Sequence, residues 1–295
     1  MNYKRNKRFM HIVRQLHGLV ELENTQKHRE SENQMGNLLS KNKNFTFSDD
    51  YVHTIHAEWT RYIYGTHDNQ IVFYCHGGGY MTGSTSYARG ITTKLAKYTQ
   101  HDVFSFDYRL APESPFPAAI EDSFSAWLHI LSKGFQPKDI IIAGDSAGGN
   151  MALVLTLLLK EKGYSLPKCL ILFSPWTDMT SSGDSYLSKA EYDPILTASY
   201  LQKATSNYLQ GTSSSLPYVS PLFADLHDFP PVYIQVGENE ILQDDSIQLY
   251  KALLSCNVHA RLDIFPGMWH VFQMAPFKSA KIAMNKVAEF INQIS

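Results

Sequence analysis

Short apolar runs alternate along the chain with longer segments whose apolar residues recur at helical spacing. The first such segment, at about residues 8–23, predicts an amphipathic helix, and a second helix is predicted near Met35 to Leu39. Strand signals begin around Tyr51. Beyond it the predicted strands are 71–75, 103–106, 140–143, 169–173, 232–236 and 260–265, and the predicted helices are 91–98, 118–131, 150–162, 246–254 and 278–294. Strands separated by helices predict right-handed crossovers and a mostly parallel sheet covered on both faces.

Residues 178–226 interrupt this rhythm with a stretch that is rich in Ser, Tyr and Leu and is broken by prolines. We interpret it as a helical insertion over the carboxyl edge of the sheet, where ligands bind in open α/β folds. The prediction is a catalytic core of residues 46–177 and 227–295. The insertion at 178–226 and an N-terminal helical segment at 1–45 together form a small cap.

The composition excludes several classes of protein. With 44% hydrophobic and 18% charged residues and a net charge of −2, the chain resembles an ordinary soluble protein with no nucleic-acid partner. The longest apolar run, Met151 to Leu159, is too short to span a bilayer, and polar residues break the segment behind the basic N-terminus where a signal peptide needs an apolar stretch. Three scattered cysteines indicate neither a disulfide framework nor a metal site. We therefore expect a cytoplasmic protein with no membrane association.

Residues 144–148 read Gly-Asp-Ser-Ala-Gly, between a β-branched run and an apolar helical stretch. A strand, a Gly-x-Ser-x-Gly turn and a helix together make a nucleophile elbow, in which the strained turn lifts one serine hydroxyl above the sheet. Ser146 is therefore the candidate nucleophile. Its alternative role is to cap the following helix, for which serine is also suited.

A glycine-rich loop, His76-Gly77-Gly78-Gly79, directly follows the strand 71–75. Such a run can be a plain turn, but glycines also let backbone N–H groups point into a cleft as an oxyanion hole, to which the Ala147 N–H adds a donor. We interpret His76 as a structural residue of this loop. Tyr80 beside the loop either lines the substrate pocket or wedges the loop against the core.

The general base and its carboxylate partner are expected later in the chain, in the order Ser, acid, His. His270 follows the strand 260–265 and is the candidate base. The candidate acid is Glu240, because it lies a few residues beyond the strand 232–236 on a loop that can turn toward the histidine. The other carboxylates there fit less well, since Glu238 leaves the strand earlier and Asp244 and Asp245 look like a helix start.

Four motifs together resemble the hormone-sensitive lipase family of α/β hydrolases, in its bacterial esterase branch. They are HGGGY at 76–80, DYRLAPE at 107–113, GDSAGGN at 144–150 and GMWH at 267–270, and the resemblance covers about residues 70–295. It implies an eight-stranded, mostly parallel α/β-hydrolase core with a small helical cap. It further implies a serine carboxylesterase that needs no metal or cofactor and hydrolyses short-chain acyl esters through an acyl-enzyme intermediate.

The resemblance also implies roles for individual residues. Ser146 and His270 belong to the triad, and the N–H groups of Gly78, Gly79 and Ala147 form the oxyanion hole. Family members usually carry Asp-x-Leu-x-Asp in the acid loop, whereas this chain has Glu240 at the first position and Asp244 at the last, so the choice of acid stays open between the two. The charged residues of the DYRLAPE motif are expected to form a buried network that braces the oxyanion loop.

Other assignments remain open at this point. Several family members dimerise through the edge strand, here 260–265, which makes a homodimer an option. The same machinery serves amide or lactone hydrolysis, and one plant receptor family uses this fold to bind small molecules, but such receptors typically lack the triad histidine that His270 supplies. The sequence does not identify the physiological ester.

Overall fold

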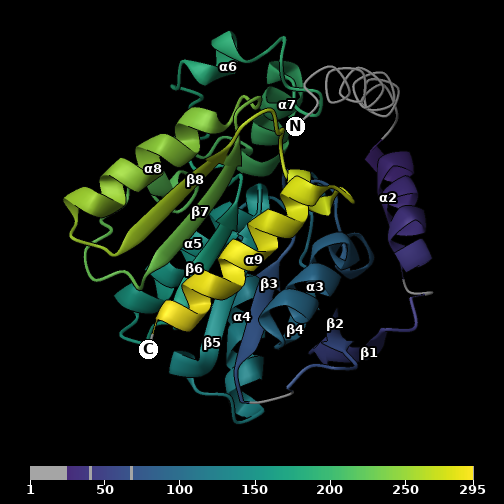
Figure 1. Cartoon of the computed structure of the whole chain (residues 1–295). Helices are drawn as coiled ribbons and strands as arrows, with labels where there is room; N and C mark the ends of the chain where they lie inside the picture. Colours follow the sequence, from purple (N-terminus) through teal and green to yellow (C-terminus); the bar gives the residue numbers. More distant parts are fainter. Residues whose placement is uncertain (1–24, 40–41, 67–68, 295) are drawn as a thin grey trace.

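The computed structural model describes residues 25–39, 42–66 and 69–294, and their strands form one sheet (Figure 1). The strand order is β1-β2-β4-β3-β5-β6-β7-β8. β1 pairs antiparallel with β2 and β2 antiparallel with β4, while all the other neighbours are parallel. The strands are β1 (Phe45–Val52), β2 (Ile55–Tyr62), β3 (Ile71–Cys75), β4 (Asp102–Phe106), β5 (Ile140–Asp145), β6 (Cys169–Phe173), β7 (Val232–Gly237) and β8 (Ala260–Phe265).

Helices cover both faces of this sheet. Because side chains alternate along a strand, Val72 and Tyr74 pack with α3 and α9 on one face, while Phe73 and Cys75 pack with α4, α5 and α8 on the other. The helices are α2 (Thr25–Leu39), α3 (Thr85–Thr99), α4 (Ala118–Ser132), α5 (Ala147–Glu161), α6 (Ser185–Ser188), α7 (Ala198–Leu209), α8 (Gln243–Ser255) and α9 (Lys278–Gln293), with short 3₁₀ turns at η1 (Pro137–Asp139), η2 (Pro221–Phe223) and η3 (Phe272–Met274).

The mostly parallel sheet and the order of its elements confirm the predicted architecture, with differences in the first part of the chain. The strand signal near Tyr51 belongs to an antiparallel hairpin of two strands, β1 and β2. α3 begins earlier than its apolar pattern indicates, because Ser84 caps it by accepting a hydrogen bond from the Tyr87 N–H at 3.1 Å. The helix predicted at about 8–23 lies outside the described residues.

Three helices lie around one end of the sheet. α6 and α7 come from the segment between β6 and β7, and α2 packs against α3 (Figure 1). The approach of α2 to α3 requires a glycine, since a Cβ on Gly36 would lie 1.9 Å from the Ser86 carbonyl oxygen. The helix predicted near Met35 to Leu39 is thus the last part of the longer α2. No helix in the described part of the chain is both long and apolar enough to cross a membrane.

Candidate active site

The turn between β5 and α5 has the geometry of a nucleophile elbow. Ser146 adopts φ 54° and ψ −119°, a strained backbone for a residue with a side chain. The turn is tight because Gly148 lies against the neighbouring strand end, where a Cβ would come within 2.1 Å of the Cys75 carbonyl oxygen. Ser146 occupies the N-cap position of α5, yet its side chain makes no capping hydrogen bond. The hydroxyl is therefore not committed to a capping role.

The oxyanion-loop candidate, residues 76–79, lies beside this turn. Gly78 and Gly79 have φ values of 114° and 61°, which residues with a side chain rarely adopt. His76 is fully buried, and its ring stacks on Tyr108 at a centroid distance of 4.1 Å. Burial lowers the pKa of His76, which favours the neutral ring expected of a structural residue. Ala147 is the first residue of α5, so its N–H has no acceptor within the helix.

Asp145, which the sequence analysis did not single out, joins the oxyanion loop to the elbow. Its carboxylate accepts hydrogen bonds from the Gly77 N–H at 2.8 Å, from the Tyr87 hydroxyl at 3.3 Å and from the Tyr74 hydroxyl. The side chain is fully buried, and burial raises its pKa. Because Asp145 directly precedes Ser146, its carboxylate fixes the position of the oxyanion loop relative to the candidate nucleophile. The sequence does not indicate this role, because Asp145 ends an apolar strand and the residues that donate to it are distant in the chain.

Glu240 lies against the candidate base. Its Oε2 is 2.8 Å from Nδ1 of His270, and both side chains are buried, with 0% and 4% of their surfaces exposed. The other oxygen, Oε1, accepts hydrogen bonds from the Ser174 hydroxyl at 2.9 Å and from the Gly237 N–H. Burial would lower the pKa of His270, but the hydrogen bond and charge of Glu240 raise it above its usual value, with help from Asp193 and Asp145. The pair is arranged to hold one orientation of the imidazole and to stabilise its protonated form.

The other acidic residues of this loop have different partners. Asp244 accepts a hydrogen bond from the Ser185 N–H at 2.8 Å, and Glu238 accepts one from the Gly267 N–H at 2.7 Å. Asp245 accepts from the backbone of Thr177 at 2.7 Å. Of the carboxylates that the sequence left as alternatives, the structure therefore brings Glu240 to His270.

One small cavity is lined by two of the three triad candidates, Ser146 and His270. It has a volume of about 70 Å³. Its lining residues come from the elbow, the oxyanion loop, the candidate base, α3 and both parts of the predicted cap: Ser146, Gly78, Gly79, His270, Tyr87, His28, Glu32, Ile195, Leu196 and Tyr200. A wider cavity of about 600 Å³ lies beside α8 and is lined by Asp178, Asp244 and Asp245 among others, but none of Ser146, Glu240 and His270 lines it. The candidate nucleophile and base therefore line the smaller cavity and not the wider one.

Two cap carboxyls near this cavity carry roles that no sequence motif indicates. Glu32 of α2 accepts hydrogen bonds from the Gly83 N–H at 3.0 Å and the Thr82 hydroxyl at 3.3 Å, and burial raises its pKa to about 7. Asp193 of the insertion accepts from the backbone of Leu196 at 3.0 Å and of Ile241 at 2.9 Å. Glu32 thus contacts the segment that follows the oxyanion loop, and Asp193 joins the cavity wall to the loop that carries Glu240.

Two expectations about the surroundings of the site need correction. Tyr80 does not line the cavity. It is fully buried, stacks on Tyr208 at a centroid distance of 3.9 Å and donates its hydroxyl to Asn150 at 2.8 Å, so it wedges the loop against the core. Its predicted part in substrate binding therefore has no support in its position.

The DYRLAPE charges do not form a buried network. The side chains of Asp107, Arg109 and Glu113 are 37%, 49% and 63% exposed. Their ion pairs stay at the water boundary because burying charge is costly. The residue of the motif that braces the oxyanion loop is Tyr108, whose hydroxyl donates to the His76 carbonyl oxygen at 2.8 Å.

Comparison with known proteins agrees with this geometry. A family model described as an alpha/beta hydrolase fold matches residues 72–274. An esterase of Acinetobacter venetianus is 41% identical over 76% of this chain and 75% of its own, and an acetyl-hydrolase of Streptomyces hygroscopicus is 35% identical over 73% and 72%. Among solved structures, an esterase of the bacterial hormone-sensitive lipase family matches 98% of this chain and 97% of its own with a TM-score of 0.91 and 32% identity.

The chain therefore belongs to the hormone-sensitive lipase family of α/β hydrolases. It is a carboxylic-ester hydrolase.

Proposed function

We propose that this protein is a serine carboxylesterase that hydrolyses short-chain acyl esters through an acyl-enzyme intermediate. The observation that carries the proposal is the shared cavity, in which Ser146 and His270 face the same space as Gly78 and Gly79. Acyl transfer needs a nucleophile, a base and donors for the oxyanion at one place, and this cavity brings residues of all three kinds together.

The proposed reaction uses the same groups in both half-reactions. His270 takes the proton of the Ser146 hydroxyl as the oxygen attacks the acyl carbon, and the N–H groups of Gly78, Gly79 and Ala147 stabilise the negative charge that develops on the carbonyl oxygen. The imidazolium, stabilised by Glu240, returns the proton to the leaving alcohol. Water then attacks the acyl-enzyme by the same route and releases the acid.

The size of the cavity supports a short acyl group. Its volume of about 70 Å³ is far below the roughly 300–1,000 Å³ of sites for drug-sized ligands. The named relatives point the same way: one is an acetyl-hydrolase, and another solved relative, EstE5, was soaked with p-nitrophenyl butyrate. A cavity of this size favours an acyl chain of a few carbons over a fatty acyl chain.

The test is turnover of a p-nitrophenyl ester series from acetate to palmitate by the wild-type chain and by Ser146→Ala. We expect activity that peaks at the short chains and a fall of kcat by a factor on the order of 10⁴–10⁶ in the variant, because the nucleophile is lost. Circular dichroism should show the variant folded. Retained ester turnover in Ser146→Ala would refute the serine mechanism, and a peak at long chains would refute the short-chain preference.

A further inference from the structure

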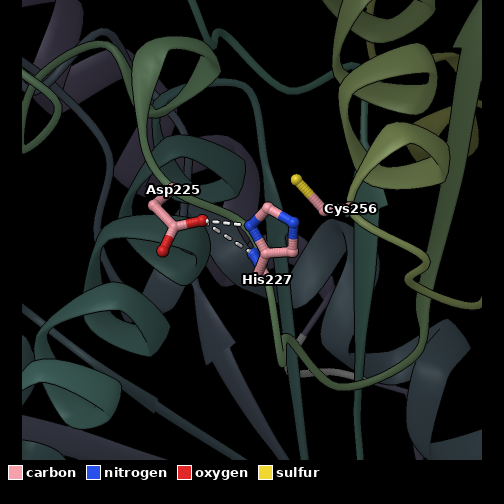
Figure 2. Close-up of side chains that lie close together, drawn as sticks. All are labelled: Asp225, His227 and Cys256. Carbon is pink, nitrogen blue, oxygen red and sulfur yellow. Dashed lines mark hydrogen bonds and ion pairs between the residues drawn. The ribbon is translucent and has the colours of Figure 1, made fainter.

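Three metal-ligating side chains meet at a place remote from the candidate active site. Asp225, His227 and Cys256 offer a carboxylate oxygen, a ring nitrogen and a sulfur that all lie within 4.8 Å of one another (Figure 2). Asp225 and His227 lie between η2 and β7, and Cys256 follows α8 just before β8. The cluster therefore lies near the amino ends of these parallel strands, whereas Ser146 follows the carboxyl end of β5.

We propose that Asp225, His227 and Cys256 form a binding site for a divalent cation of the zinc class, with water completing the coordination. The spacing of residues in the sequence does not reveal this site. Cys256 is about thirty residues from the other two side chains, and only the fold brings it to them.

The donor set selects the kind of cation. One thiolate, one imidazole and one carboxylate are the ligands that tetrahedral Zn²⁺ prefers, whereas Mg²⁺ and Ca²⁺ require oxygen ligands. Zinc bonds of about 2.0–2.3 Å place neighbouring ligand atoms roughly 3.3–3.8 Å apart. The ligand atoms lie at most 4.8 Å apart, and the closest pair, Oδ1 of Asp225 and Nδ1 of His227, is 2.6 Å apart. Side-chain rotations that bring the sulfur nearer and move the carboxylate and imidazole apart would give the spacing of a zinc site. Two of the side chains, Asp225 and His227, lie at the surface, where rotamers change freely.

The carboxylate and imidazole are already oriented toward each other. Nδ1 of His227 is 2.6 Å from Oδ1 of Asp225, and the backbone N–H of His227 donates to the same oxygen at 3.1 Å. Lys160 of α5 donates to the other oxygen, Oδ2, at 3.3 Å and to the His227 carbonyl oxygen at 2.5 Å. Lys160 thus holds the loop in place and leaves Oδ1 as the oxygen that faces the imidazole.

The sulfur is held from the other side. Cys256 ends α8, where its backbone N–H donates to the Ala252 carbonyl oxygen at 3.1 Å, and its side chain packs partly against the core. Figure 2 shows the imidazole between the Asp225 carboxylate and the Cys256 sulfur. A bound cation would join the end of α8 to the loop before β7. Binding also requires the thiol to give its proton to solvent, so affinity should rise with pH.

The chain offers an unambiguous spectroscopic test. Cys75 and Cys169 are buried and Cys256 is partly exposed, so a thiolate signal reports on Cys256. We would titrate the full chain with Co²⁺ as a zinc substitute and follow the thiolate-to-cobalt charge-transfer band, then displace it with Zn²⁺ and measure Zn²⁺ affinity by calorimetry. We expect a band at one equivalent, loss of the band in Cys256→Ser, and a fall in Zn²⁺ affinity of at least about tenfold in Cys256→Ser and His227→Asn.

The matched control is His259→Asn, an exposed histidine three residues beyond Cys256 that does not belong to the cluster. It should bind Co²⁺ and Zn²⁺ as the wild-type chain does. Zn²⁺ should also raise the Tm of the wild-type chain and not of Cys256→Ser, while ester turnover stays unchanged in all three variants. Cobalt binding without the thiolate band, or equal Zn²⁺ affinity in the wild type and His227→Asn, would overturn the proposal and show only adventitious binding elsewhere. Neither result would bear on the serine mechanism.

Discussion

The two walls of the catalytic cavity are held in place by different kinds of interaction. On the core side, Ser146 and Gly78 owe their positions to backbone conformations with positive φ, fixed between strand and helix ends. On the cap side, α2 packs closely on α3 at Gly36 and is otherwise held by side-chain contacts. Arg29 donates to the Met81 carbonyl oxygen at 2.8 Å and forms a paired contact with Glu113 at 2.9 Å to each oxygen. The core wall should therefore be rigid, and the cap wall adjustable by a single substitution.

The largest effect after loss of the nucleophile should come from the core wall. We expect Glu240→Gln to lower kcat/KM by a factor on the order of 10²–10⁴, because the imidazole loses its orienting charge. Since Glu240 raises the pKa of His270, the acid limb of the pH–rate profile should also move to lower pH. Asp244→Asn is the control and should change kcat/KM by less than about tenfold. A larger loss in Asp244→Asn would show that the wrong carboxylate has been chosen.

A smaller effect is expected when the cap wall loses its main anchor. Arg29→Met removes the hydrogen bonds to Met81 and Glu113, so α2 should pack less firmly over the cavity. We expect KM for a short ester to rise by about three- to thirtyfold with kcat changed less, because the change affects binding more than the reacting groups. Lys27→Met, on an exposed position of the same helix, should leave both constants unchanged. If kcat alone fell, the cap would be part of the catalytic geometry and the contrast between the walls would fail.

The smallest effect concerns Glu32 and appears in stability. Its pKa of about 7 lies above the usual value near 4.5, so the folded chain binds this proton more tightly than the unfolded chain. The contribution is complete below about pH 4.5 and is lost as the pH rises through about 7. Glu32→Gln should remove this loss and be more stable than the wild type by about 1–3 kcal/mol at pH 8, relative to their difference at pH 4.5.

Urea unfolding at several pH values measures this difference. Glu30→Gln, an exposed change on the same helix, is the control and should track the wild type across the range. Parallel curves for Glu32→Gln and the wild type would mean that Glu32 is ionised in the folded chain without cost. The ionised Glu32 would then add a second charged contact to the ion pair of Arg29 and Glu113 in the cap wall.

The contrast between the walls also explains what the sequence could predict. The elbow could be predicted because the periodicity of the sequence placed β5 and α5. Its contact between Gly148 and the end of β3 then follows from the alternation of strands and helices. The same holds for His270, which needs only a position after β8. The carboxylate that faces it was less certain, because Glu240 and Asp244 lie only four residues apart and the three-dimensional geometry is needed to distinguish them.

The cap could not be predicted in this way. Arg29 and Glu32 meet partners more than fifty residues away, and no periodic pattern encodes such pairings. The role of Asp145 was concealed because a fully buried carboxylate is recognised by its three donors and not by its neighbours in the chain. Tyr80 was open to two interpretations since an aromatic beside a loop can face the ligand or the core, and its stacking on Tyr208 decides for the core.

The backbone of Ser146 has an evolutionary consequence. A residue with a side chain at φ 54° and ψ −119° costs of order 1–3 kcal/mol, which glycine would not incur. Ser146→Gly should therefore raise the Tm above that of Ser146→Ala, which keeps the strain, while both are inactive. If Ser146 is the nucleophile proposed above, a duplicated copy of this chain that is released from selection for turnover would gain stability by losing it. Selection for turnover would then oppose an improvement in folding at this position.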